Sequence, residues 1–397
     1  MQTHALLDKR FAGYVLLLTL STVAWSFALV ALPFQALGLP RGHQTLVLAV
    51  ALGTLPRLLA PLLAPWLRSG LRSINAVAAA LAALVILRTA CRTEPAWIQF
   101  SYLLLGTNAV LDGITPSLLV RAWFPEETRM RANALVGMVT LGVPVVAWPL
   151  AGHLSGSGSP IAVLGLAASG YLGKAVLAYA ALPRRAVQPD EPLPAAGERP
   201  ALPHYAPLLF IVVLAMVWLG YLQVAVPVMV EHLPAPGAVY GWYGGLFSLG
   251  MAAGAGTLFV VGNRAEPARA LGLAGFFLPL GVVLYALPGI AALLAAGAVY
   301  GFGLGAVQTA GATYLQKVVP RPALARVLAW VTSAAAAASL AGAALAGLVL
   351  NRHARLALVV VVLQIVAAAF WGFGRGDARN AVQRGPGARP RPSKKRG

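Results

Sequence analysis

Three charged residues lie inside long apolar runs of the sequence, where charged residues are rare. Arg57 stands in LGTLPRLLAPLLAP, Asp112 in YLLLGTNAVLDGITPSLLV and Lys174 in YLGKAVLAYAAL. Burying a charge in hydrocarbon costs at least about 2.5–3.5 kcal/mol at the centre of a helix, so such residues usually face a partner or water. A carboxylate beside a cation can bind and release a proton as the distance between them changes. These residue types could therefore form an ion pair that exchanges a proton.

The composition requires a membrane for the elements that carry these residues. Hydrophobic residues make up 59% of the 397 residues and charged residues 10%, and the mean hydropathy is +0.77. These values exclude a soluble domain with a wetted surface. A helix needs about 20 mostly apolar residues to cross the hydrocarbon. The sequence contains twelve such runs, which predict an all-α integral membrane protein with twelve transmembrane helices, near 11–32, 44–66, 74–91, 96–120, 132–153, 161–182, 206–230, 240–262, 268–287, 290–314, 323–350 and 355–374.

The basic residues indicate how these spans are oriented. Counting the C-terminal tail, 23 of the 30 lysines and arginines fall in the N-terminal segment, the tail and alternate connections. This bias follows the positive-inside rule and predicts a multi-pass protein of the inner membrane with both termini in the cytoplasm. The formal net charge of +19 is thereby a signal of topology, and we expect no nucleic-acid partner.

Under this topology the three buried charges lie at similar depths. Arg57 is about 13 residues from the outer end of its span, or ~20 Å, and Asp112 is about 16 residues, or ~24 Å, from the outer end of its own. The similar depth predicts that Arg57 pairs with Asp112 and that protonation of Asp112 releases the arginine to act on a substrate. A purely structural salt bridge is the alternative. Lys174, also ~20 Å deep, lies two turns from the cytoplasmic end of its span and is expected to snorkel to water, while a role in a cavity stays open.

An internal repeat divides the chain into two halves. Residues 183–205 form the longest polar, Pro-rich interruption, with six runs on each side. A constant offset of 195 residues aligns Gly106 with Gly301 and Pro125 with Pro320. Parallel six-span repeats with a binding site at their interface are a plan of secondary transporters. The expected organisation is an N-terminal six-helix bundle over 1–182, a cytoplasmic linker over 183–205, a C-terminal six-helix bundle over 206–374 and a basic, disordered cytoplasmic tail over 375–397.

Several short stretches carry a resemblance to one family of transporters. LAPWLRSGLRS matches the turn G-x-L-A-D-R-x-G-R-R at Arg68, Gly70 and Arg72, with Leu67 in place of the aspartate. On this turn and the repeat, the chain resembles the major facilitator superfamily over nearly its whole length. LPRLLAPLLAP, FPEETRMRANAL and VVPRPALARV are most similar to the macrolide and enterobactin exporters, and ANAL and AGATYLQ are similar to the lysophospholipid transporters. The resemblance implies two six-helix pseudo-repeats that work by alternating access.

The candidate site residues fall into three sets. Arg57 and Asp112 are expected to couple protons to the substrate. Further polar and aromatic residues of the spans could line a substrate cavity: Trp25, Asn108, Lys174, Tyr221, Gln223, Gln308 and Tyr314. Arginines of the cytoplasmic turns are expected to form a gate: Arg68, Arg72, Arg129, Arg131 and Arg326. A cavity with charge in the first half and aromatic or amide groups in the second suits a large amphipathic molecule.

The chain lacks the residue pattern of an enzyme active site. The six histidines stand at span ends and in loops, and the sequence contains no ATP-binding motif. We therefore expect no catalytic residue, no metal and no cofactor. The sequence predicts a secondary active transporter, monomeric in the lipid bilayer, that exports a small molecule such as a drug or siderophore by proton antiport. Lipid or lysophospholipid flipping and organic-anion import remain open, and an integral-membrane enzyme is the least favoured alternative.

Overall fold

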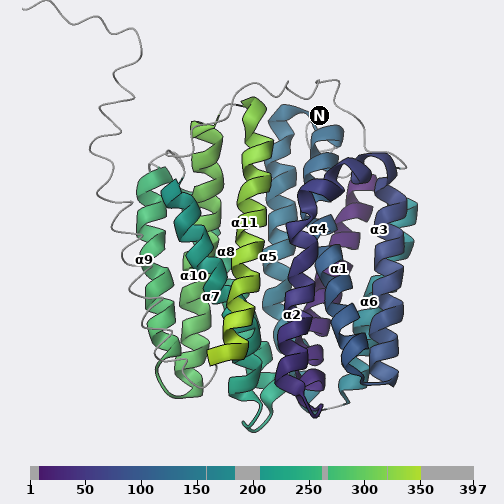
Figure 1. Cartoon of the computed structure of the whole chain (residues 1–397). Helices are drawn as coiled ribbons and strands as arrows, with labels where there is room; N and C mark the ends of the chain where they lie inside the picture. The colour runs from purple at the N-terminus through teal and green to yellow at the C-terminus, as the bar shows by residue number, and fades with distance from the viewer. Residues whose placement is uncertain (1–8, 158, 184–205, 262–266, 320, 350–397) are drawn as a thin grey trace, which may run out of the picture.

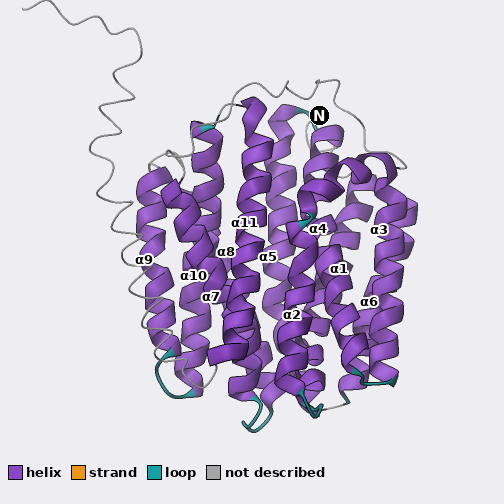
Figure 2. Cartoon of the chain, viewed as in Figure 1, coloured by secondary structure: helices purple, strands orange, loops and turns teal. Residues whose placement is uncertain are grey.

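The computed structural model describes residues 9–157, 159–183, 206–261, 267–319 and 321–349. Within these ranges the chain is built from helices, and Figure 2 shows no strand among them. The helices, as labelled in Figure 1, are α1 (Lys9–Leu37), α2 (Gly42–Leu58), α3 (Ala60–Cys91), α4 (Pro95–Trp123), α5 (Glu126–Ser157), α6 (Pro160–Ala181), α7 (Ala206–Val230), α8 (Pro236–Val261), α9 (Pro267–Tyr285), α10 (Ile290–Val318) and α11 (Arg321–Val349). The all-α membrane fold is thus confirmed, and the expected span 355–374 lies outside the described residues.

The helices follow the expected apolar runs closely. α7 covers Ala206–Val230, as predicted. The described helices contain nine stretches that are long and apolar enough to cross a membrane, and α9 adds a shorter one at Gly275–Tyr285. Pro95 and Pro160 stand in the first turns of α4 and α6, where a missing backbone N–H leaves no hydrogen bond unmade. The starts of these two helices are therefore encoded locally.

The second expected span is irregular where its prolines gather. The three prolines of LPRLLAPLLAP have no backbone N–H, so the helical hydrogen bonds around them cannot be completed. α2 ends at Leu58 and α3 begins at Ala60, but the φ and ψ angles of Leu59 remain helical. The stretch Gly42–Leu62 therefore still forms one span, in agreement with the span predicted over 44–66, and the kink that leads into the next span lies at Gly70.

The internal repeat is visible in the helix bounds. Moving α4 by 195 residues gives the bounds of α10, and the start of α5 falls on the start of α11. The packing repeats as well. A side chain at Gly106 of α4 would collide with the backbone of Gly53 in α2, and one at Gly301 of α10 would collide with the backbone of Phe247 in α8. Small residues at these positions let the paired helices approach closely in lipid.

The two halves lie side by side and meet along two pairs of helices. In the first half α6 packs against α1 and α3, and α2 packs against α4. In the second half α10 packs against α8 and α9, and α7 packs against α11. The halves touch mainly through α5 with α8 and α2 with α11, which stand between the two groups of helices in Figure 1.

The buried apolar side chains indicate where the halves are joined. One core cluster contains residues of both halves, and its first-half members lie toward the end of the bundle opposite the N-terminus, such as Leu32 and Leu46. A second cluster lies at the N-terminal end of the first half and includes Phe11, Leu119 and Leu182. Among the described residues, the halves therefore share a core at the opposite end, while the N-terminal end of the first half has a core of its own.

Close contacts at the opposite end agree with this division. A side chain at Gly152 of α5 would collide with the backbone of Gly237 and Gly241 in α8. The His43 imidazole lies 3.6 Å from the Glu231 carboxylate, which joins the start of α2 to the connection after α7. Gly152, the last glycine of GMVTLGVPVVAWPLAG, thus serves close packing of α5 against α8, whereas a side chain at Gly137 or Gly142 would meet no atom within 4 Å.

Candidate functional site

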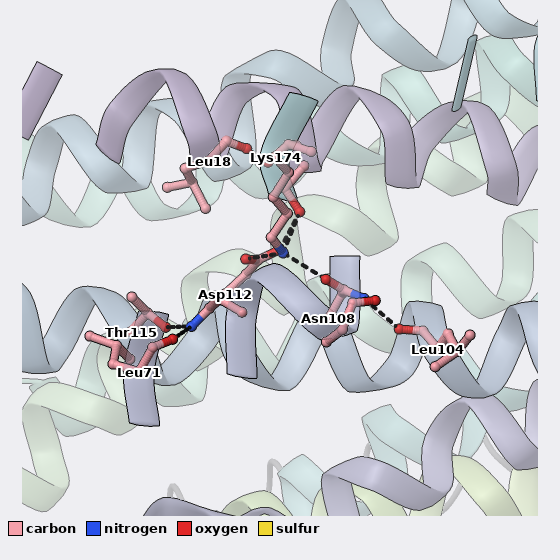
Figure 3. A network of polar contacts seen from close by, with 11 residues as sticks. Leu18, Leu71, Leu104, Asn108, Asp112, Thr115 and Lys174 are labelled. Atoms are coloured by element: carbon pink, nitrogen blue, oxygen red, sulfur yellow. Dashed lines mark hydrogen bonds and ion pairs between the residues drawn. The ribbon is translucent and has the colours of Figure 1, made fainter. Parts of the chain in front are cut away.

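One face of α4 carries the polar residues of the candidate site. Asn108, Asp112 and Thr115 follow each other at intervals of four and three residues, which places them on the same side of a helix. Figure 3 shows this face directed toward Lys174, which reaches it from α6. α4 and α6 both contact α1, and the buried lysine side chain joins α6 to α4 in the interior of the first half.

Lys174 and Asp112 form a buried ion pair. The Lys174 Nζ atom lies 2.7 Å from the Asp112 Oδ1 atom, and it also donates hydrogen bonds of 2.9 Å to the Ser21 hydroxyl and the Asn108 Oδ1 atom. An ammonium group has three donors, and all three are used here. The Ser21 hydroxyl in turn donates to the Asp112 Oδ2 atom. The serine, the lysine and the aspartate thus close a triangle of hydrogen bonds.

The expectation that Lys174 snorkels to water is wrong. Its side chain is 0% exposed, because α6 packs against α1 and α3 and presents this residue to them. An ammonium group at this depth is stable only when its charge and its donors are matched, and Asp112, Ser21 and Asn108 match them. Asn108 is fully buried as well, so neither it nor Lys174 lines a cavity wall in this conformation.

The expected pair of Arg57 with Asp112 is absent from this structure. Asp112 is held by Lys174 and Ser21, whereas the Arg57 side chain forms no hydrogen bond or ion pair with any of the described residues. The arginine is partly exposed and stands in the last turn of α2. A helix C-terminus stabilises a cation by about 0.3–1 kcal/mol, which is less than the ~2.5–3.5 kcal/mol cost of an arginine at a membrane helix centre. The helix alone therefore does not compensate the charge.

The ion pair is asymmetric in its exposure. The Asp112 side chain is 20% exposed, against 0% for Lys174. The next residue of α4, Gly113, is exposed, and a side chain there would meet no atom within 4 Å. The carboxylate is thus partly accessible and the ammonium group is not, and open space borders α4 at Gly113.

Further polar atoms around the pair are buried without a hydrogen-bond partner among the described residues. They are the hydroxyls of Tyr14 and Tyr171 and the Oδ1 atom of Asn75. The Tyr171 ring lies 5.8 Å from the Lys174 Nζ atom, in range of a cation–π contact. Asn75 donates to the Leu71 carbonyl at 2.9 Å and to the Thr115 hydroxyl at 3.4 Å. The surroundings of the pair thus hold unused polar capacity.

Comparison with known proteins shows which known fold this chain has. The family model of the Major Facilitator Superfamily matches residues 208–396. The nucleoside transporter NupG superposes with a TM-score of 0.68 at 14% identity, over 91% of this chain and 98% of that chain. The chain has the major facilitator fold.

Two further structures with this fold are similar over most of their length. The peptide transporter POT in complex with sulfate has a TM-score of 0.68 and 14% identity, with 90% of this chain and 94% of that chain covered. A bacterial homolog to the human lysosomal transporter Spinster, in an inward-facing and unoccupied conformation, has a TM-score of 0.61 and 13% identity, with 92% and 97% covered. No curated protein sequence matches the chain significantly.

In a major facilitator fold the substrate site lies between the halves near mid-membrane. The predicted cavity residues differ in their burial and in whether they contact the other half. The Trp25 ring lies 6.2 Å from that of Trp148, and Trp148 lies 5.3 Å from Tyr240, so these rings join α1, α5 and α8 across the halves. Tyr221 is buried and stacks on Trp218 at 4.9 Å, and its hydroxyl has no partner among the described residues. Of the remaining predicted cavity residues, Gln223 and Tyr314 are partly buried and Gln308 is exposed.

Of the predicted gate residues, Arg72 alone has a side chain in the described part of the chain. Its Nε atom donates to the Leu182 carbonyl at 2.8 Å, and its guanidinium lies 5.3 Å from the Tyr179 ring. Arg72 thus ties α3 to the end of α6 within the first half, and no contact to the second half is seen for it. The side chains of the remaining gate residues lie outside the described part of the chain: Arg68, Arg129, Arg131 and Arg326.

The described residues hold no group of three or more His, Cys, Asp or Glu side chains that could bind a metal ion. Ser21 and Tyr171 belong to the site and were missed from the sequence, because hydroxyls are common in apolar spans and carry no charge to mark them. The spacing of Tyr171 and Lys174, one turn apart on α6, was the available signal.

Proposed function

We propose that this protein is a secondary active transporter that exports an amphipathic small molecule in exchange for protons. The observation that carries the proposal is the buried Asp112–Lys174 pair, in which the carboxylate alone is partly exposed. A proton can reach the partly exposed Asp112 carboxylate, whereas the fully buried ammonium group is not accessible.

Protonation of Asp112 would force a rearrangement of the site. The neutral acid no longer balances the Lys174 charge, and a buried charge that loses its partner is strongly destabilised. The first half must then change its packing so that the lysine finds water or another acceptor. Proton binding and a change of conformation are linked by this requirement, as coupled transport demands.

Alternating access would use the contacts between the halves. Both termini are proposed to be cytoplasmic, from the positive-inside distribution of basic residues. The end that is joined through α5–α8 and α2–α11 is then the outer one, and the described conformation faces inward. We propose that Arg129, Arg131 and Arg326 close the cytoplasmic end in the other state, in an inner-membrane protein that acts as a monomer.

Export is proposed from the resemblance of LPRLLAPLLAP, FPEETRMRANAL and VVPRPALARV to macrolide and enterobactin exporters. Lysophospholipid flipping and organic-anion import would use the same Asp112–Lys174 pair and the same relative movement of the two halves. Direction and substrate are therefore separate from the coupling step and are tested separately.

The test uses purified protein in proteoliposomes with erythromycin or enterobactin as probe. We expect a lumen more acidic than the bath to drive accumulation of a probe against its gradient. Asp112→Asn should abolish this pH-driven accumulation and retain probe exchange without a pH gradient. The matched control is Glu94→Gln, an acid at the other end of α4, which should behave as wild type. Equal pH-driven accumulation by wild type and Asp112→Asn would contradict the coupling proposal, and the absence of any probe movement would contradict the export of these two classes.

A further inference from the structure

Among the three charged residues inside the spans, Arg57 is the one whose side chain has no ion-pair partner in the described part of the chain. Asp112 and Lys174 neutralise each other at 2.7 Å, and the described residues offer Arg57 no hydrogen bond or ion pair. The middle of the first half therefore carries one uncompensated positive charge. Such a charge in a membrane protein is a candidate binding group, because ionisable residues at this depth usually have a partner.

The packing of α2 on α4 fixes where Arg57 lies. Gly53 of α2 contacts Gly106 of α4, and both helices start from the same end of the bundle. Arg57 is one turn beyond Gly53 on the same face, so it lies level with Val110. Gly113 shares the Gly106 face of α4, because it is seven residues further on, and its open space is within about one turn of Arg57. The guanidinium thus lies beside this open space and at the depth of the ion pair, whereas Asp112 belongs to another face of α4.

The helical turn after Arg57 is irregular at Leu59, since Pro61 has no backbone N–H. An aromatic surface stands on α1, which contacts both α2 and α4. Trp25 stands one turn from Ser21 on α1, is partly exposed and contacts Trp148 of α5.

We propose that Arg57 binds an anionic group of the transported molecule, a carboxylate, sulfonate or phosphate attached to an apolar body. A guanidinium matches the planar or tetrahedral oxygens of these groups with two parallel hydrogen bonds. The aromatic edge of Trp25 and Trp148 takes the apolar body. This inference rests on the proposed function as a transporter and names the substrate class, whereas proton exchange remains with Asp112.

The test compares amphiphiles with one tail and different head charge. Octyl sulfonate, octyltrimethylammonium and octyl glucoside are titrated against purified protein in nanodiscs, with tryptophan fluorescence as readout. We expect octyl sulfonate to bind at least about tenfold more tightly than the other two. Arg57→Gln should remove this preference, and Arg57→Lys should keep part of it, because lysine retains the charge and loses the two parallel hydrogen bonds.

A second pair of probes separates a lipid from a small soluble anion. Lysophosphatidylglycerol and lysophosphatidylcholine share a tail and differ in net head charge. If the Arg57-dependent preference appears for lysophosphatidylglycerol alone, the anion is a lipid headgroup, and if it appears for octyl sulfonate as well, the site accepts small anions. Wild type without charge preference for either set, or a preference that survives Arg57→Gln, would overturn the proposal.

The control variant is Arg88→Gln. Arg88 stands in the last turn of α3 over the Trp97 ring at 5.2 Å and lies far along the chain from the site. It should keep the full charge preference. Monodisperse elution of both arginine variants establishes that they fold. The charge preference is measured by binding without a pH gradient, and proton coupling is measured by pH-driven accumulation in proteoliposomes, so failure of the anion site and failure of the proposed function are distinguishable.

Discussion

At the scale of single residues, the two members of the ion pair do not depend on each other equally. Lys174 has no access to water, and its three donors are committed to Asp112, Asn108 and Ser21. Asp112 is partly exposed and keeps the Ser21 hydroxyl even without the lysine. Lys174 therefore depends on Asp112 more than Asp112 depends on Lys174.

This asymmetry predicts the order of stability of two variants. Asp112→Asn should destabilise the protein more than Lys174→Met, because it leaves a buried ammonium group without a carboxylate. Removing one member of a buried pair costs about 3–5 kcal/mol, and we expect Asp112→Asn to approach this range and Lys174→Met to fall below it. Unfolding midpoints of the purified proteins in one detergent measure the difference.

The double variant completes this comparison. Asp112→Asn with Lys174→Met leaves no charge to bury, so it should be more stable than Asp112→Asn alone while lacking proton coupling. A double variant as unstable as Asp112→Asn, or one that still accumulates a probe along a pH gradient, would contradict the role given to the pair.

The sequence identified the three buried charges and assigned one pair wrongly. The rise per residue gives the depth of Arg57, Asp112 and Lys174, and their depths are similar. It does not give the direction in which each side chain leaves its helix relative to the other helices. Packing of α6 on α1 and α3 decides that Lys174 points inward, and this contact between distant segments is absent from a local pattern.

At the scale of helices, close packing is concentrated at particular glycines. Gly106 and Gly113 stand on the same helix, seven residues apart, in opposite situations. A side chain at Gly106 would collide with the backbone of Gly53, while one at Gly113 would meet nothing within 4 Å. The pair offers a matched test of helix contact in α4.

We expect Gly106→Ala to destabilise the protein and Gly113→Ala to be tolerated. Overpacking costs about 1–3 kcal/mol, and the fixed backbone of α2 gives the added methyl group no flexible side chain to displace. Gly113→Ala adds a methyl group in open space and removes a glycine from a helix. Thermal midpoints by size-exclusion chromatography compare the two. Equal midpoints would mean that α2 and α4 are not in close contact in the membrane.

Helix positions were largely predictable, whereas their interruptions were less so. Runs of about 20 apolar residues fix where the spans lie, and the 195-residue offset anticipated that α4 and α10 share bounds. The span predicted over 44–66 agrees with the stretch Gly42–Leu62, but its irregular turn at Leu59 was not predicted, because apolar character continues through LPRLLAPLLAP. Hydropathy does not register a missing backbone N–H, although the spacing of the prolines does.

At the scale of the whole molecule, the contact of α2 with α11 can be used to hold one conformation. A Cβ atom at Gly347 would lie 3.9 Å from the Cβ atom of Val47, within the 3.5–4.5 Å typical of disulfides. The two residues belong to different halves and lie at the closed end. The exposed Cys91 is first replaced by serine.

Val47→Cys with Gly347→Cys should form a disulfide and stop transport until a reductant is added. The bond would prevent the halves from separating at this end, so only one access state remains. Gel mobility measures the crosslink and proteoliposome uptake measures the arrest. Val47→Cys with Leu348→Cys is the control, because Leu348 is exposed and should crosslink poorly. Full transport by the oxidised Val47–Gly347 variant would exclude separation of the halves at this end.

The placement of all three buried charges in one half has an electrical consequence. In the described part of the second half, charged residues stand at helix ends and in connections, so rocking of the halves moves the first-half charges through the membrane voltage. With Asp112 protonated and no substrate, Lys174 and Arg57 carry two positive charges, and with Asp112 ionised and an anion on Arg57 the site is neutral. A full crossing of the field is worth about 2.3 kcal/mol per elementary charge per 100 mV. The voltage therefore acts on the proton-loaded step, drawing it toward the negative side, and leaves the substrate-loaded step nearly indifferent to it.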